Sequence, residues 1–325
     1  ALTGTTVAQS SSPIAVSAAG SRYYTLRFDA AAAPCNANAP ALSLSLFSGA
    51  TTLLAPFPTA VNPCAITGNV FYTSPAQTAS GGLLDPAIGS SARAATFTGP
   101  SAALLTPMQI AAAQVRVTNS TTGVGSGFGI DNLRVLDVTP SLDWAFSPSS
   151  VPVGSASTLT YTITNTSDLL AKSDWTFTNT LPAGLTVAPA PAVGGTCTQV
   201  TGTTFAVTAL AGSSSIAVVG GDLAASAASC TVTVNVVAST EATFTNAPSN
   251  VVTPLIAPEA ATLTVTPASR LTVRKNLPAR LASTDQFTLS VRSGSTVIAS
   301  ATTTGTATGL QAAQHASRQV DDACA

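Results

Sequence analysis

Apolar and polar residues alternate with a period of two along most of this 325-residue chain. Within residues 157–164, Leu159, Tyr161 and Ile163 occupy every second position, with threonines between them. Residues 230–236 repeat the pattern, with Cys230 in phase with three valines. Because successive side chains of a strand point to opposite faces, these segments predict β-strands with one buried and one hydroxylated face. We therefore expect Cys230 to point into a core.

The same alternation recurs in residues 42–46, 262–265 and 287–291, and glycine, proline and serine clusters separate the runs. One buried and one polar face is typical of antiparallel sheets packed as a sandwich. The alternation breaks between Ile130 and Leu133, which predicts a β-bulge there. The fold class that we predict is all-β, with tandem antiparallel β-sandwiches.

Three segments follow from the positions of the strands and turns. Residues 1–138 and residues 139–269 each predict a β-sandwich, and residues 270–325 predict a partial sandwich followed by an irregular tail. That the first sandwich is jelly-roll-like and the second immunoglobulin-like is what the family resemblances given below imply. The last segment offers three or four strands, which are few for an independent sandwich. From Gln311 onward the alternation stops, and this tail holds His315 and Cys324. It could be a short helix, a disordered end or sequence foreign to the module, and the pairing of Cys324 stays open.

The composition excludes several classes of protein. Hydrophobic residues make up 45% of the chain and charged residues 8%, against about 25% charged residues in an ordinary soluble domain. The apolar stretches are interrupted every few residues, so the sequence predicts no membrane insertion. The 12 basic residues form no cluster, which argues against nucleic-acid binding.

Four of the five cysteines predict two local disulfides, Cys35–Cys64 and Cys197–Cys230. Each would close a loop of about 30 residues and add on the order of 3–4 kcal/mol. Such bonds persist in an oxidising compartment, so the expected location is extracellular or at the cell surface. The alternative is four buried free thiols. No signal peptide is visible at Ala1, so it was cleaved or the sequence begins downstream of it.

The sequence offers few residues that could serve in catalysis. The one histidine lies in the irregular tail, so a Ser-His-Asp or Cys-His arrangement is not expected. Asp131, Asp137 and Asp143 recur every six residues, and paired carboxylates could serve a glycosidase. The simpler interpretation is that they end strands and cap turns. The sequence predicts no enzyme.

Two kinds of ligand site are conceivable in the first segment. Asp29 and Asp131 could contribute to a structural calcium site, the only cofactor that we consider, because Ca²⁺ prefers carboxylate and carbonyl oxygens. Tyr23, Tyr24 and Tyr72 could stack on the apolar faces of a sugar. The alternative for the aromatic residues is burial in the core.

The middle segment contains Phe177-Thr-Asn-Thr-Leu-Pro-Ala-Gly-Leu-Thr-Val187, preceded by the 159–165 strand and followed by Cys197 and Cys230. On these residues it resembles the conserved repeat module of large bacterial cell-surface proteins. The resemblance covers about 130 residues and implies an immunoglobulin-like sandwich.

Two further resemblances concern the ends of the chain. Residues 270–310 resemble the start of a prealbumin-like repeat, found in collagen-adhesin stalks and pilins. That resemblance implies that Lys275 could form an isopeptide bond with a later Asn or Asp; otherwise Lys275 is a solvated strand residue. Residues 128–133 resemble the closing strand of jelly-roll modules in secreted carbohydrate-binding proteins and adhesins.

The function hypothesis is a non-enzymatic extracellular structural or adhesive surface protein. In its sharper form the chain is a filament subunit whose partner is itself: a strand near one terminus, such as 5–8 or 13–17, completes a sandwich of the next chain. The alternative is a monomeric module that binds a surface glycan. The short last segment could equally reflect truncation of a longer protein.

Overall fold

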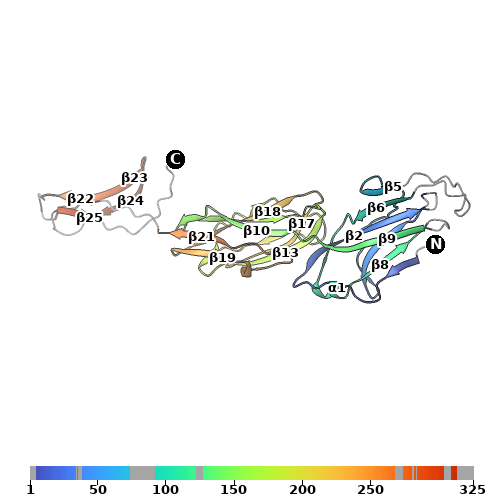
Figure 1. Ribbon diagram of the computed structural model, residues 1–325. Coiled ribbons are helices and arrows are strands. Elements are labelled where there is room, and N and C mark those ends of the chain that lie inside the picture. Colours follow the sequence, from blue (N-terminus) through green and yellow to red (C-terminus); the bar gives the residue numbers. More distant parts are fainter. Residues whose placement is uncertain are drawn as a thin grey trace, which may run out of the picture.

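The computed structural model describes residues 5–33, 35, 39–73, 92–121, 127–267, 274–279, 282, 284–303 and 309–312. Strands dominate this part of the chain, where the only helical elements are α1 (Pro107–Ala111) and the short 3-10 helix η1 (Pro248–Asn250). Two β-sandwiches lie end to end, and a further set of strands follows them (Figure 1). The chain is therefore an all-β protein of tandem, mainly antiparallel sandwiches.

The N-terminal sandwich, as we call the two sheets formed by β1–β9, has one four-stranded and one five-stranded sheet. The first sheet has the order β1-β8-β3-β4, with bounds β1 (Thr5–Gln9), β8 (Gln114–Asn119), β3 (Leu42–Ser48) and β4 (Thr51–Leu54). The second has the order β5-β6-β2-β7 with β9 also paired to β2, and its bounds are β5 (Val70–Thr73), β6 (Arg93–Thr98), β2 (Arg22–Ala33), β7 (Ala103–Leu105) and β9 (Gly127–Asp137).

The core between these sheets follows from the alternation. In β3, Leu42, Leu44 and Leu46 are buried while the serines between them are less so. They belong to one apolar cluster with Phe28 of β2 and Phe97 of β6, whose rings stack at 5.5 Å. Side chains of both inner faces thus fill the space between the sheets.

The predicted bulge lies in β9. Arg27 of β2 is opposite Arg134 and Asp29 is opposite Asp131, so one residue of β2 faces two residues of β9. Asn132, inside the bulge, has a φ of 50°, a conformation that Asn adopts more readily than most residues. The bulge prediction is therefore confirmed.

The middle sandwich, formed by β10–β21, contains three sheets. The first has the order β10-β12-β18-β14 with β15 also on β18: β10 (Ser141–Ser147), β12 (Ser157–Thr164), β18 (Ser229–Ala238), β14 (Leu185–Val187) and β15 (Gly194–Gly195). The second has the order β16-β17-β13-β20: β16 (Ala206–Thr208), β17 (Ser215–Leu223), β13 (Lys172–Thr180) and β20 (Val251–Val252). The third joins β11 (Ser150–Pro152), β21 (Ala261–Thr266) and β19 (Ala242–Asn246), with β11 parallel to β21.

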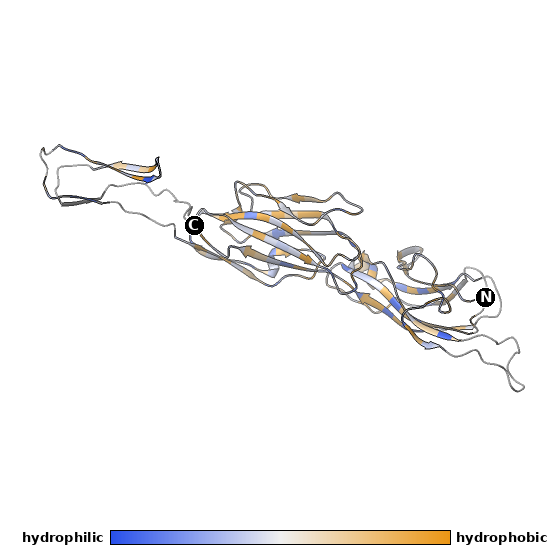
Figure 2. Ribbon diagram, turned by 90° about the horizontal axis from the view of Figure 1, so that it is seen from above, coloured by the Kyte–Doolittle hydropathy of each residue, from blue (hydrophilic) through white to orange (hydrophobic). Residues whose placement is uncertain are grey.

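Aromatic residues fill the centre of the middle sandwich. Tyr161 of β12 and Phe177 of β13 face each other with ring centroids 4.7 Å apart, and Trp175 stacks parallel to Phe177 at 6.4 Å. Hydrophobic residues recur along the strands of both sandwiches (Figure 2). Cys230 is buried in this core, as its phase in the alternation predicts.

The C-terminal strands form two separate two-stranded sheets. β22 (Arg274–Leu277) pairs with β25 (Gly309–Ala312), and β23 (Thr288–Ser293) pairs with β24 (Thr296–Thr302). Residues 313–325, with His315 and Cys324, lie outside the described residues, so the predictions about this part of the tail cannot be compared with the structure.

Candidate functional site

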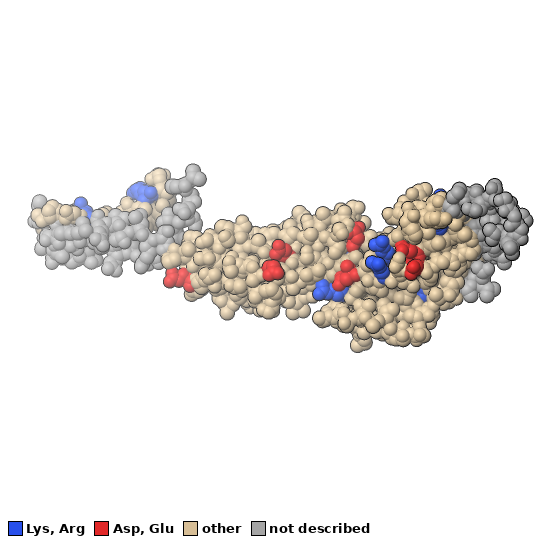
Figure 3. Space-filling model, viewed as in Figure 1, with Lys and Arg blue, Asp and Glu red and all other residues tan. Residues whose placement is uncertain are grey.

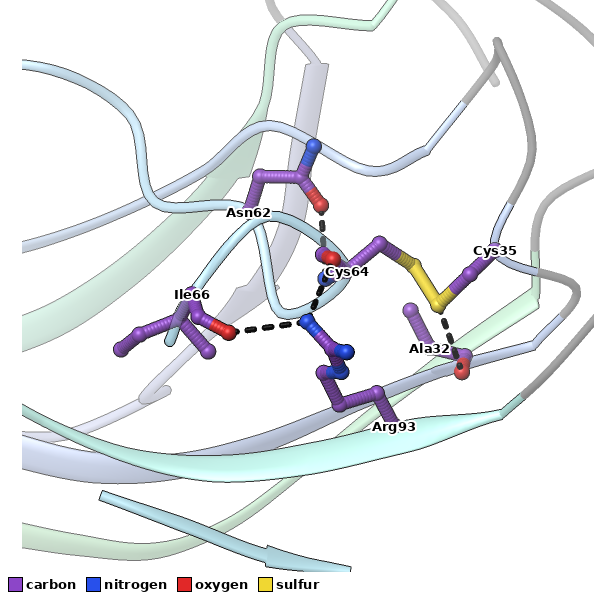
Figure 4. Close-up of a disulfide and its surroundings, with 6 residues drawn as sticks. All are labelled: Ala32, Cys35, Asn62, Cys64, Ile66 and Arg93. Carbon is purple, nitrogen blue, oxygen red and sulfur yellow. Dashed lines mark hydrogen bonds between the residues drawn. A yellow bond between two sulfur atoms is a disulfide. The ribbon is translucent and has the colours of Figure 1, made fainter. Parts of the chain in front are cut away.

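A disulfide and an arginine brace the loop between β4 and β5. Cys35 and Cys64 are bonded, as predicted. Arg93 of β6 donates from Nη1 to the carbonyl oxygens of Cys64 and Ile66, each at 2.9 Å, and the Cys64 N–H donates to Asn62 Oδ1 at 2.9 Å (Figure 4). The guanidinium and the covalent bond together hold this loop against the sheet.

Next to this loop, β5 exposes two aromatic side chains. Tyr72 is 55% exposed and Phe71 is 61% exposed. β5 pairs with β6 through a register shift between Val70 and Tyr72. Tyr72 therefore offers an accessible ring face, which a sugar or a protein partner needs.

The other two aromatic candidates are not accessible. Tyr23 and Tyr24 are only 1% and 4% exposed. Neither ring presents a face to solvent, because both are packed in apolar clusters. The structure thus leaves Tyr72 alone among the three tyrosines as a candidate for stacking on a ligand.

Asp29 and Asp131 do lie opposite each other on β2 and β9. The Asp29 carboxylate accepts hydrogen bonds from Thr96 Oγ1 at 2.6 Å and from Asn132 Nδ2 at 2.7 Å, and these bonds lower its pKa. Asp131 accepts the N–H of Asn132 at 2.7 Å. Ca²⁺ takes six to eight oxygen ligands, and in the described part of the chain no three Asp, Glu, His or Cys side chains lie close enough together to hold a metal ion. A calcium site at this pair stays a prediction.

A cavity of about 520 Å³ opens between the two sheets of the N-terminal sandwich. It lies between β1 and β9, which are each at an edge of their sheet. Its walls are mainly apolar and include the buried residues Leu26, Leu44 and Val117, while Gln9, Ser10 and Arg134 add polar atoms.

Near the second disulfide, Cys197–Cys230, a buried carboxylate organises a loop of the middle sandwich. Asp222 is 3% exposed and accepts three backbone N–H groups, from Asp174 at 2.8 Å, Val200 at 2.5 Å and Thr201 at 2.6 Å. Bonds from N–H groups to a carboxylate are among the stronger hydrogen bonds in proteins. Asp222 thereby ties the loop after Cys197 to the start of β13.

Lys172, at the start of β13, has a fully buried side chain that the sequence did not single out. Its ammonium donates to Asp168 Oδ1 at 2.9 Å, Asn165 Oδ1 at 3.0 Å and Leu170 O at 3.2 Å. Burial lowers the pKa of Lys172, and the neighbouring Asp168 offsets this only in part. The three oxygens use all three ammonium protons, so Lys172 closes the β12–β13 loop.

Burial raises the pKa of the Asp168 carboxyl. Hydrogen bonds from Leu170, Lys172 and Thr166 lower this pKa, and together they outweigh burial, so the pKa lies below its usual value. The sequence pattern does not reveal this polar centre. Lys172 is one of two lysines in the chain and the first residue of β13, where a lysine side chain would usually lie on the outer face.

Lys275 lies on β22, with its Nζ 5.0 Å from the centroid of the Phe287 ring. A cation over an aromatic face is a favourable contact. An isopeptide bond at Lys275 stays a prediction.

Two family models match parts of this chain. A family described as a domain of unknown function (DUF7933) matches residues 140–266, and a prealbumin-like fold domain family (SpaA_3) matches residues 270–323. The prealbumin-like resemblance of the last segment is thus confirmed. The specific resemblance of the middle segment to bacterial surface repeats stays a prediction, because its matching family has no described function.

Two solved structures share low similarity with the chain. The collagen adhesin from S. aureus is 9% identical, with a TM-score of 0.26, over 81% of this chain and 92% of that one. The T6 backbone pilin of Streptococcus pyogenes serotype M6 is 10% identical, with a TM-score of 0.25, over 89% of this chain and 74% of that one. At these values neither likeness supports an argument about this chain. No curated protein sequence matches it.

Charged side chains are few on the visible face of the molecule, and most of that face is formed by uncharged residues (Figure 3). In the described residues, none of the helices is long and apolar enough to cross a membrane.

Proposed function

We propose that this chain is a non-enzymatic structural or adhesive segment of an extracellular surface protein. The observation that carries the proposal is the tandem of two β-sandwiches, each with its own disulfide. Disulfides of this kind persist in oxidising compartments. The prealbumin-like match of residues 270–323 is consistent with this role.

The carboxylates that could have served catalysis have structural partners. Asp137 accepts hydrogen bonds from the N–H and the hydroxyl of Thr139 at the end of β9, and Asp143 accepts the N–H of Trp144. These bonds support the interpretation that the recurring aspartates cap strand ends rather than act on a substrate.

In its finer form, the proposal is self-assembly by strand exchange. Two features support it: the open cavity between the edge strands β1 and β9, and the two-stranded sheets of the C-terminal segment. An unpaired edge accepts a strand from another chain through main-chain hydrogen bonds. Contacts of this head-to-tail kind do not close and produce fibres.

The segments that we considered as donors are not free. Residues 5–9 form β1, which pairs with β8 in its own sheet, and the Ile14 N–H donates to Ala113 O at 2.8 Å. A donor strand from this end therefore has to leave its own sandwich first, which makes exchange slow unless assembly occurs during folding.

Negative-stain electron microscopy of the secreted protein tests the proposal. Regular fibres support self-assembly, whereas dispersed particles contradict it and leave the structural or adhesive role. A disulfide from Thr6→Cys to Thr118→Cys, which are Cα partners in the β1–β8 ladder, locks β1 in place. Fibres that persist in this oxidised variant exclude β1 as the donor, and the reduced variant is the matched control.

The alternative function is binding of a surface glycan, favoured by the exposed Tyr72 on β5. A glycan array with the wild-type protein and with Tyr72→Ala tests it. Binding that Tyr72→Ala abolishes, and that the buried-residue control Tyr161→Phe retains, supports a glycan-binding module. Absence of binding by the wild-type protein contradicts it.

A further inference from the structure

Two adjacent tyrosines of β2 belong to different cores. Tyr24 packs in the apolar cluster of the N-terminal sandwich, together with Leu26 and Phe28. Tyr23 belongs instead to the cluster of the middle sandwich, together with Trp144 and Trp175. Because neighbouring residues of a strand point to opposite faces, β2 reaches both cores at its first residues.

Hydrogen bonds fix Tyr23 of β2 against the middle sandwich and against the connecting segment. Its hydroxyl donates to the backbone oxygen of Ser173 at 2.5 Å, at the start of β13. Burial raises the pKa of Tyr23, and the charges of Asp174 and Asp222 raise it further, so the hydroxyl remains a donor. The Tyr23 N–H donates to Thr139 Oγ1 at 2.9 Å.

The connection between the sandwiches is short, and its residues are held by hydrogen bonds to both sandwiches. Only residues 138–140 separate the end of β9 from the start of β10. Val138 donates to Tyr23 O at 2.8 Å, Pro140 accepts the Ile256 N–H at 3.0 Å, and Thr166 Oγ1 donates to Val138 O at 3.3 Å. Val138 and Thr139 are themselves buried.

Apolar side chains of the N-terminal sandwich extend this contact. Ala102, Leu104 and Leu136 pack against the core of the middle sandwich. Domains within one chain usually meet through polar contacts that permit relative motion. The contact here is continuous with a hydrophobic core, and its connecting segment has no free length.

We infer that Tyr23 makes the two sandwiches one cooperative folding unit, in which the middle sandwich depends for its stability on a folded N-terminal sandwich. The inference goes beyond the proposed function, and it holds or fails whether or not the chain forms fibres or binds glycans.

Hydrogen exchange measured by mass spectrometry on the full chain tests this inference, in a denaturant concentration below the unfolding transition. Peptides from β3 report on the N-terminal sandwich and peptides from β18 on the middle one. Tyr24→Ala weakens only the N-terminal core, and we expect it to accelerate exchange in β18 by about tenfold or more as well as in β3. Tryptophan fluorescence provides a second readout, because both tryptophans lie in the middle sandwich.

The decisive comparison uses Tyr23→Ala as the background. If Tyr23 couples the sandwiches, Tyr24→Ala added to Tyr23→Ala accelerates β3 exchange but leaves β18 as in the single Tyr23→Ala variant. Faster exchange in β3 with unchanged exchange in β18 in the Tyr24→Ala variant would overturn the inference. If the N-terminal sandwich of Tyr24→Ala does not fold, β18 peptides are still measured. Hydrogen exchange in β18 as slow as in the wild type would then also overturn the inference. The milder variant Tyr24→Leu repeats the comparison.

Discussion

At the residue scale, the middle sandwich contains polar groups in positions where alternation alone predicts an apolar core. Asn179, in phase with Trp175 and Phe177, is fully buried. Its amide exchanges hydrogen bonds with Asn246 at 3.0 and 3.1 Å and accepts the Tyr161 hydroxyl at 2.8 Å. These three buried polar side chains are tolerated because they satisfy one another's hydrogen bonds.

Lys172 gives the first prediction at this scale. Lys172→Met removes the ammonium, so Asn165 and Asp168 keep their backbone N–H donors, but Asp168 loses its counter-charge. We expect the free energy of unfolding to fall by about 1–3 kcal/mol, measured by urea denaturation followed by tryptophan fluorescence. Lys275→Met, at a less buried position, is the control and should change it by less than about 0.5 kcal/mol. Equal effects of the two variants would contradict the role that we assign to Lys172.

Asp168 predicts a pH dependence. Its pKa in the folded protein is lowered relative to the unfolded chain, so its contribution to stability is complete above the ordinary carboxyl pKa of about 3.9. That contribution is lost as the pH falls from this value through the lower folded pKa. We expect the stability of the wild type to decline more steeply below about pH 4 than that of Asp168→Asn. Parallel pH profiles of the two proteins would refute this.

At the scale of the elements, glycines decide where strands approach closely. Gly195 in β15 has a φ of +123°, and a Cβ there would lie 2.1 Å from Thr231 O of β18. Gly129 in β9 has open space where a Cβ would be. The difference arises because β15 packs tightly beside the strand that carries Cys230.

Gly195→Ala is therefore expected to lower the free energy of unfolding by about 1–3 kcal/mol, since backbone atoms must shift. Gly129→Ala should have a much smaller effect. Thermal denaturation of both variants measures the difference, and a Gly195→Ala protein as stable as Gly129→Ala would show that β15 can move away from β18.

The disulfide Cys197–Cys230, which ends on β18, gives a further prediction about stability. Cys197 and Cys230 are 33 residues apart in the sequence. In the chain-entropy account, the double variant Cys197→Ser/Cys230→Ser loses about 3–4 kcal/mol. Denaturant unfolding compares it with the wild type. A loss well below 1 kcal/mol would mean that Asp222 and the β15–β18 pairing already restrain the loop.

At the scale of the whole molecule, low charge is the dominant property. With 8% charged residues and a formal net charge of −1, long-range electrostatic forces contribute little to association. We expect the degree of self-association, measured by sedimentation velocity, to change less than about twofold between 0.05 and 0.5 M salt. A steep salt dependence would point to a charged interface.

The sequence by itself predicted the strands with clear alternation, their buried faces, the bulge near Asn132 and the pairing of both disulfides. These features are local, since the period-2 alternation sets which side chains share a face, and a cysteine in phase with valines must point inward. The same reasoning could not separate Tyr23 from Tyr24 or find Lys172. The place of Tyr23 depends on the contact of β2 with the distant strand β13. The burial of Lys172 depends on how the β12–β13 loop folds over the start of β13, which alternation does not describe.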